Sequence, residues 1–289
     1  MNITYDNFEE IIEQGLSTEN VSLRDLKWIE PVGVALLKTM YQSQLITNLS
    51  DTESVQSSAR AYIRCLTNTP ATDSERTYVT LTEFSQDLFP QSEDALVQGV
   101  VNNILHNTGS MEARDREDLR LYLIYLLGEI VRNIKDHSQS QHSYIAAQFY
   151  PSHRKTQVVI VDSGIGLRAS LERRYPEIQT HSDAILKAIE PFATGVAPNS
   201  NPYGGTTNIG LGLHMSTELI KLTKNRLKMI SGDSKLTIAN RKTVVTNLPF
   251  TWNGTIVTFE IFEHNLQQEF GELFDYIRGR IDQNGISIF

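Results

Sequence analysis

Several features that would define a class of protein are scarce in this sequence. Its 289 residues include one cysteine, Cys65, which excludes an intrachain disulfide and a cysteine-rich zinc site and fits a reducing compartment. Lys and Arg number 26 against 34 Asp and Glu, so the formal net charge is −8. This balance gives no support to nucleic-acid binding, although a local basic patch would still permit it.

Long apolar runs are also missing. The most apolar helical stretch, LRLYLIYLLGEIVRNI, is interrupted by Glu129, Arg132 and Asn133, and it is too short and too polar to cross a bilayer. The N-terminal residues, MNITYDNFEEIIEQG, are acidic and lack the basic-then-apolar order of a signal peptide. We therefore expect a soluble cytoplasmic protein that does not associate with membranes.

The order of predicted elements divides the chain into a small and a large part. Near the N-terminus, FEEIIEQGL and VGVALLKTMYQSQL predict helices and VSLRDLKWI predicts a strand. A stretch rich in Thr, Ser, Asp and Pro follows at 66–92, where YVTLTEF suggests a strand, and a helix is predicted at 93–107. The predicted division is an α/β module at 1–70, a connecting segment at 71–110, a larger domain at 111–265 and a C-terminal helix at 266–289.

The larger domain combines helices with strands that suggest antiparallel pairing. REDLRLYLIYLLGEIVRNIKDH predicts a long helix, and HSYIAAQFY and TQVVIVD predict two strands joined by the hairpin-like PSHRK. LRASLERRY, SDAILKAIE and GLGLHMSTELIKLTKNRL predict helices, and KMISG, SKLTIAN, KTVVTNL and TIVTFEIF predict four short strands before the helix FGELFDYIRGRI. The pattern predicts an α+β sandwich with the helices on one face of a mixed sheet.

The stretch TQVVIVDSGIGLR has three interpretations. Its GIGLRA segment fits the letters of the dinucleotide fingerprint G-x-G-x-x-G/A. That fingerprint requires a second parallel strand after the helix, whereas LRASLERRYPEIQTHSDAILKAIE is helix-like throughout. The Walker loop is absent. Two interpretations remain: a tight turn after a strand, and a nucleotide-binding loop of another kind.

Polar residues lie on one stripe of the long predicted helix. A carboxylate beside a buried face is costly without a partner, so the stripe is either a solvated flank or a pair of functional groups facing a cavity. In the second case the amide oxygen would bind a hard cation such as Mg²⁺, and the carboxylate would orient a water molecule. The stripe consists of Tyr122, Leu126, Glu129, Asn133 and His137.

Four segments, in this order, match motifs of a known family. They are E-x-x-x-N in GEIVRNIKDHS, D-x-G-x-G in DSGIG after a strand, the glycine pair of NIGLGL, and the G-T of NGTIVTFEI. Over about 115–263 the chain resembles the GHKL, or Bergerat, ATP-binding fold shared by gyrase, heat-shock chaperones of the ninety-kilodalton class, histidine kinases and MutL. The resemblance implies ATP and Mg²⁺ as cofactors.

The same resemblance assigns roles to residues. Asp162 would accept a hydrogen bond from the adenine amino group, and Gly164 and Gly166 would let the backbone approach the nucleotide. Asn133 would hold Mg²⁺ between the phosphates, and Glu129 would position or deprotonate the attacking water.

Further residues complete the implied site. Residues 192–209 would form a lid over the nucleotide, followed by N–H groups at a helix start that bind phosphates. His137 occupies a position that is polar in many relatives, and a purely structural histidine is the alternative. The remaining implied nucleotide-binding residues are Thr206, Thr207, Gly210, Leu211, Gly212 and Thr255.

The N-terminal module has a second resemblance. VSLRDLKWIEPVGVALLKTM is similar to the strand–loop–helix of STAS domains, the anti-sigma-factor-antagonist fold, whose loop usually reads close to I-D-S-S-G and carries a phosphorylated serine. Here the loop is IEPVG, and Pro31 and Val32 stand at the serine positions. This departure argues against the phosphorylation switch, and an unrelated α/β cap is the alternative to a STAS domain.

Together these resemblances imply a Mg-dependent ATP-binding protein, a slow ATPase that acts as a conformational or partner-binding switch. The alternatives are a serine/threonine protein kinase of the anti-sigma type and a nucleotide sensor without turnover. A histidine kinase is disfavoured because His106, in NILHNTG, lacks the acidic neighbour and long helix of a phospho-acceptor. A cation reaching the terminal phosphate would come from the lid, the N-terminal module or a second subunit, so we expect a protein partner or a second subunit.

Overall fold

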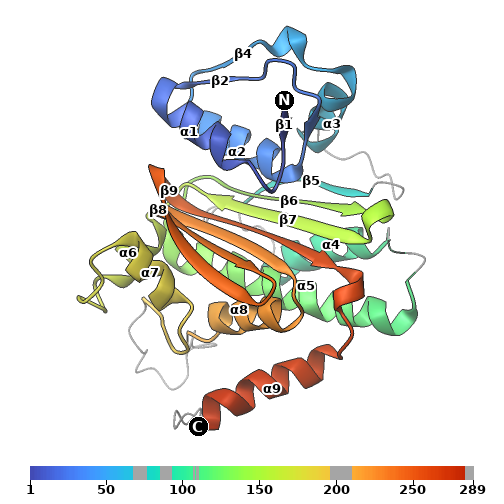
Figure 1. The fold of residues 1–289 in the computed structure, drawn as a ribbon, viewed down its shortest axis with the longest axis vertical. Coiled ribbons are helices and arrows are strands. Elements are labelled where there is room, and N and C mark those ends of the chain that lie inside the picture. The colour runs from blue at the N-terminus through green and yellow to red at the C-terminus, as the bar shows by residue number, and fades with distance from the viewer. Residues whose placement is uncertain (68–76, 85–92, 107, 109–110, 196–209, 284–289) are drawn as a thin grey trace.

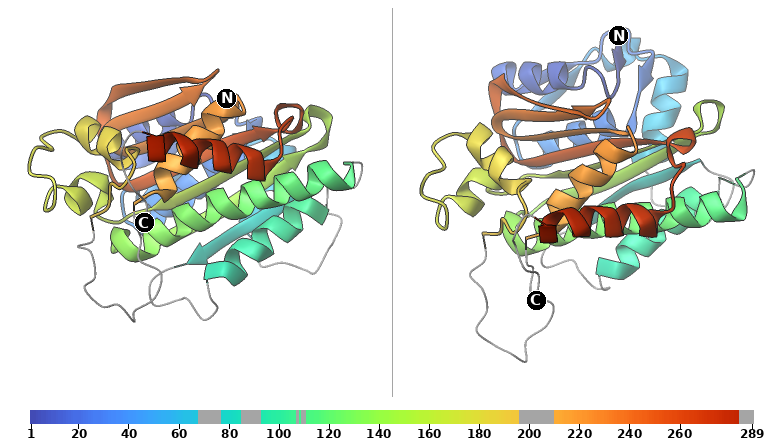
Figure 2. Two further views of the ribbon diagram at one scale, coloured as in Figure 1. Left: turned by 90° about the horizontal axis from the view of Figure 1, so that it is seen from below. Right: turned by 60° about the horizontal axis from the view of Figure 1, so that its bottom comes forward.

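The computed structural model describes residues 1–67, 77–84, 93–106, 108, 111–195 and 210–283 (Figure 1). A five-stranded sheet with strand order β5-β6-β7-β9-β8 forms its centre. Helices cover one face of this sheet, and the N-terminal module covers the other (Figures 1 and 2). The strands are β5 (Tyr78–Phe84), β6 (Ser143–Tyr150), β7 (Lys155–Asp162), β8 (Arg226–Ala239) and β9 (Lys242–Phe262).

Every strand pair in the five-stranded sheet is antiparallel. The predicted α+β class is confirmed, but the predicted mixed sheet is wrong. Short turns join β6 to β7 and β8 to β9, and a short turn can link only antiparallel neighbours. The β8–β9 turn consists of Asn240 and Arg241, both at positive φ, as a two-residue hairpin requires.

The four short strands predicted at the end of the domain are two long ones, β8 and β9. Gly232, which the sequence suggests as a strand end, instead lies at an irregularity in the β8–β9 register with φ of 65°. A glycine at positive φ lets the strand bend and continue without ending the ladder.

Strand β7 is buried on both faces. Val158 and Ile160 belong to the core under the helices, and Val159 and Val161 belong to the core under the N-terminal module. Because successive side chains of a strand point to opposite faces, two-sided burial explains the uninterrupted apolar run VVIV. The last residue of the strand, Asp162, lies fully buried at the end of the sheet.

Helices α4, α5, α8 and α9 form the layer on one face of the sheet. The predicted C-terminal helix α9 buries Leu273, Ile277 and Ile281, spaced four residues apart, against this layer. Strand β5 and helix α4, from the segment predicted to connect two domains, pack with the larger unit. The helices on this face are α4 (Glu93–His106), α5 (Ala113–Asn133), α8 (Gly212–Leu222) and α9 (Phe270–Gln283).

Two shorter helices lie at one end of the sheet, next to the end of β7 (Figure 1). They are α6 (Gly166–Leu171) and α7 (His181–Ala188). Short 3₁₀ turns occupy Thr52–Ser54, Pro151–His153 and Glu263–Asn265. Within the described parts of the chain, no helix has the length and apolar character that crossing a membrane requires.

The N-terminal module contains three helices and two small parallel strand pairs, β1 with β3 and β2 with β4. The single strand predicted for VSLRDLKWI is two short strands, because the chain turns between them with Asp25 at a φ of 53°. The elements are β1 (Asn2–Ile3), α1 (Glu9–Thr18), β2 (Asn20–Ser22), β3 (Trp28–Ile29), α2 (Pro31–Gln42), β4 (Asn48–Ser50) and α3 (Ser57–Thr67).

Buried polar contacts fix this module to the sheet. The Glu30 carboxylate accepts hydrogen bonds from the Tyr5 N–H at 2.6 Å and from Gln157 Nε2, on β7, at 2.8 Å. Lys228, on β8, donates to the Tyr5 carbonyl at 2.7 Å and to Glu9 at 3.0 Å. Since such bonds need defined positions, they set how the module sits on the sheet.

Replacement of Glu30 should measure the strength of this attachment. Glu30→Ala removes the acceptor of two buried donors, Tyr5 N–H and Gln157 Nε2, at a cost of about 1–3 kcal/mol for each unsatisfied group. Glu30→Gln keeps one side-chain oxygen and should therefore lose clearly less stability than Glu30→Ala. The free energy of unfolding in urea, measured for both variants and the parent, gives the two losses. Equal losses would mean that the acceptor contributes little.

Candidate functional site

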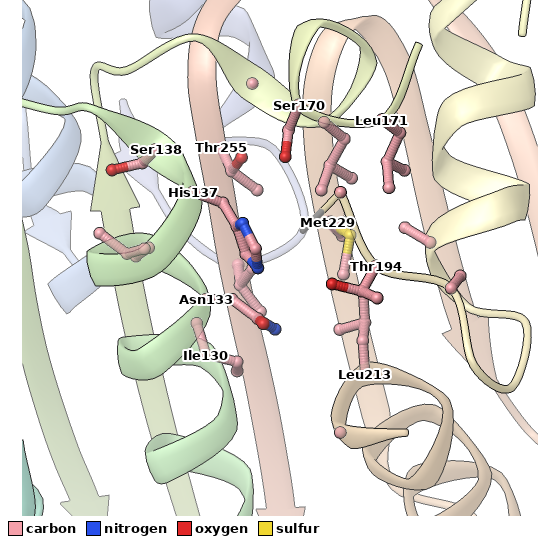
Figure 3. A pocket seen from close by; sticks show the side chains of 18 of the residues that line it. Ile130, Asn133, His137, Ser138, Ser170, Leu171, Thr194, Leu213, Met229 and Thr255 are labelled. Atoms are coloured by element: carbon pink, nitrogen blue, oxygen red, sulfur yellow. The ribbon is translucent and has the colours of Figure 1, made fainter. Parts of the chain in front are cut away.

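The long helix α5 ends in one π-helical turn, η2 (Ile134–Ser138). Such turns often occur at functional sites. Here the turn forms one wall of a pocket whose other walls come from the end of β7, α6, the start of α8 and the sheet (Figure 3). The predicted site residues that line this pocket are Asn133, Asp162, Gly166, Gly210, Gly212 and Thr255.

Asp162 is the buried carboxylate of the pocket, with no exposed surface. Its Oδ1 accepts the Gly164 N–H at 2.9 Å, and its Oδ2 accepts the Thr255 N–H at 3.1 Å. Burial raises the pKa of this carboxyl to about 7, and the two backbone hydrogen bonds oppose the rise. Each carboxylate oxygen can accept a further hydrogen bond, so Asp162 can still receive a donor from a bound molecule.

The loop after Asp162 needs its glycines for reasons within the protein. A Cβ atom at Gly164 would overlap the Ser138 carbonyl oxygen, which accepts the Ile165 N–H at 2.8 Å. Gly166 has a φ of 73° and begins α6. The D-x-G-x-G segment therefore fits closely against the π-helical turn. Gly166 lines the pocket, whereas Gly164 packs behind it.

Glu129, the predicted catalytic residue, is not among the residues that line the pocket. Its Oε1 accepts a hydrogen bond from Arg132 Nη1 at 2.8 Å, and Arg132 Nε also lies 3.8 Å from Glu93. Its Oε2 lies against the backbone of Gly212, where a Cβ atom would overlap it. The carboxylate therefore rests on the first residue of α8, which does line the pocket.

Helix α8 begins at the wall of the pocket. Leu211 precedes the helix without a side-chain hydrogen bond to cap it, and Gly210 has a φ of 73°. The first N–H groups of a helix have no partner within it and attract negative charge. Thr206 and Thr207 lie outside the described residues, as does 196–209 of the predicted lid.

The pocket lining also includes residues outside the predicted set of site residues. His137 points into the pocket from the π-helical turn, and burial lowers the pKa of its imidazole, which favours the neutral form at neutral pH (Figure 3). Its place on the helical stripe was the signal for it. Ser170, Thr194 and Met229 also face the pocket, from α6, the described start of the predicted lid and β8. Nothing in the local sequence marks Ser170 and Met229.

The residues present are compatible with a magnesium ion carried by a nucleotide, but not with a site made by protein groups alone. Asn133 directs its amide into the pocket (Figure 3), and amide oxygen is a hard ligand suited to Mg²⁺. Among the residues that the structure describes, no group of three or more His, Cys, Asp or Glu could hold a metal ion. Phosphate oxygens and water would have to supply the other ligands.

The raised pKa of Asp162 predicts how stability depends on pH. Between 3.8 and about 7 the unfolded chain has lost the carboxyl proton while the folded chain keeps it, so raising the pH through this window lowers the free energy of unfolding. Asp162→Asn cannot ionise and should lose this decline. Urea denaturation of both proteins should therefore show that the free energy of unfolding of the variant increases relative to that of the parent as the pH rises. A constant difference would contradict the raised pKa.

Comparison with known proteins finds no match for this chain: no model of a protein family matches the sequence, and none of the curated proteins matches it.

Proposed function

We propose that this chain is a Mg-dependent ATP-binding protein, a slow ATPase whose nucleotide state controls its conformation or its binding to a partner. One observation carries the proposal: a fully buried carboxylate, Asp162, lies in a pocket whose walls are otherwise largely apolar. Adenine is a flat aromatic base whose ring faces pack well against apolar side chains and whose edge carries one amino group. Apolar walls suit the ring, and the carboxylate suits the amino group.

The walls around Asp162 support adenine more than guanine. Ile134, Leu171, Met229 and Val257 contribute apolar surface to the pocket. Guanine would present a carbonyl where adenine presents its amino group, and a carbonyl opposite a carboxylate pairs two acceptors. Below its raised pKa the Asp162 carboxyl is protonated, so the discrimination should be clearest at a pH above about 7.

The phosphates would bind at the start of α8, because the first N–H groups of a helix have no partner within it and attract negative charge. Asn133 lines the same pocket from α5 and would hold Mg²⁺ against the phosphate oxygens. When bound, Mg²⁺ would neutralise part of the phosphate charge. The protein itself contributes one amide ligand, a helix end and a shaped cavity.

Glu129 would act on the attacking water, and its surroundings support slow turnover. A general base must present a free carboxylate oxygen to the water. One oxygen of Glu129 is paired with Arg132 and the other rests on Gly212. A shift of either contact would have to precede proton transfer, so a low rate follows from the same geometry.

Adenine selectivity tests the nucleotide assignment. Asp162→Ala removes the proposed acceptor, and a lost buried hydrogen bond of about 1–3 kcal/mol should weaken ATP binding at least several-fold. The parent should bind ATP more tightly than GTP, and Asp162→Ala should reduce that preference. Titration calorimetry at a pH above about 7 measures both affinities. Equal affinity of the parent for ATP and GTP would exclude the assignment.

Replacement of Glu129 tests the chemistry separately from binding. Glu129→Ala should leave ATP affinity largely intact and reduce phosphate release by roughly 10²-fold, the usual loss for a general base. Glu117→Ala is the matched control, because Glu117 pairs with Arg120 on the same helix at the same spacing and, unlike Glu129, does not lie against Gly212.

The fate of the label from γ-labelled ATP separates the alternatives. Free phosphate supports an ATPase, label on a protein supports a serine/threonine kinase, and intact ATP supports a sensor without turnover. Unchanged release by Glu129→Ala would remove Glu129 from the mechanism.

A further inference from the structure

A second concave surface lies on the N-terminal module, between α2, α3 and β4. Its floor is apolar: Val34 and Leu37 from α2, Leu49 from β4 and Val55 line it, with Ile63 from α3. None of these residues belongs to the nucleotide pocket. We call this surface the α2–α3 groove.

The rim of the groove carries mainly positive charge. Lys38 on α2 and Arg60 and Arg64 on α3 line it, against one acid, Glu53. Arg60 Nη2 donates to the carbonyl oxygens of Thr52 and Glu53, which hold the guanidinium without neutralising its charge. Among the described residues, neither the Lys38 nor the Arg64 side chain forms an ion pair.

This charge contrasts with that of the whole chain, whose formal net charge is −8. A local positive rim around an apolar floor selects partners that are acidic and apolar at once. Tyr41, 56 % exposed, lies at the same groove, and tyrosine and arginine are the side chains that most often dominate protein interfaces.

The walls indicate the shape of the partner. Val34, Leu37 and Tyr41 follow one another at helical spacing along α2, and Arg60 and Arg64 do so along α3. Side chains spaced in this way on two neighbouring helices form ridges between which a third helix can pack. We propose that the α2–α3 groove binds an amphipathic helix of a partner protein, with apolar residues on one face and acidic residues beside them.

The test uses a fluorescent synthetic helix with leucines on one face and glutamates on the other, and the same peptide with lysines in place of glutamates. Fluorescence anisotropy with the full chain should show binding of the glutamate peptide, weaker binding of the lysine peptide, and a loss of affinity as salt is added. Lys38→Glu combined with Arg64→Glu should weaken binding of the glutamate peptide by about tenfold or more and strengthen binding of the lysine peptide.

Matched variants separate the groove from general charge. Arg173→Glu combined with Lys242→Glu makes the same change in charge at exposed residues outside the groove and should leave peptide affinity nearly unchanged. Tyr41→Ala removes an exposed side chain and should weaken binding without lowering the unfolding midpoint. Unfolding midpoints of all variants, measured alongside, exclude loss of the fold as the cause.

Several results would overturn the proposal. Absence of binding by the glutamate peptide would do so, as would equal binding of the two peptides or an equal effect of the groove and control variants. Binding to phosphatidylglycerol vesicles that depends on Lys38 and Arg64, without peptide binding, would assign the groove to a membrane. Self-association that depends on these residues, again without peptide binding, would assign it to a second copy of the chain.

Discussion

The buried carboxylate of Asp162 connects the parts of the structure that form the site. Its two side-chain oxygens accept N–H groups from the following loop and from Thr255 on β9, and its backbone carbonyl accepts the Trp252 indole N–H at 3.1 Å. Burying a carboxylate without such partners would be costly. The loop, the late strand and the end of β7 therefore hold one another in position, and the pocket is shaped around that junction.

The N-terminal module makes this burial possible. Strand β7 can carry apolar side chains on both faces because one face lies under helices and the other under the module. The module also binds β7 directly, through Glu30 and Gln157, five residues before Asp162. Helix α2, which lines the α2–α3 groove, packs against the same strand. A change in how the module sits would thus reach the buried carboxylate through a single strand.

The sequence predicted local elements well where one physical signal dominated. The stripe that ends in Asn133 and His137 predicted the long helix, and these two residues line the pocket, whereas Glu129 on the same stripe does not. The sheet was harder. Its mixed character was a wrong inference, since pairing direction depends on which strands become neighbours, and Gly232 looked like a strand end because a bulge and a turn use the same residue.

The site was predictable only in part for a related reason. Asn133, Asp162, Gly166, Gly210, Gly212 and Thr255 were named from motifs, and the structure brings them to one pocket. Ser170 and Met229 have no local signal, because they are lining residues only through tertiary packing. The pairing of Glu129 with Arg132 follows from helical spacing, but its contact with Gly212 depends on how α5 and α8 pack.

That contact gives a physical reason for the proposed dependence on magnesium. The Glu129 carboxylate rests on the first residue of α8, where the helix end favours negative charge. A nucleotide phosphate bound at the same helix end would bring a second anion to this carboxylate. Two anions so close repel unless a cation lies nearby. Asn133, one turn after Glu129 on α5, lines the pocket and, under the proposed function, would hold that cation through its amide oxygen. The spacing of E-x-x-x-N would then reconcile phosphate binding with a base at one helix end.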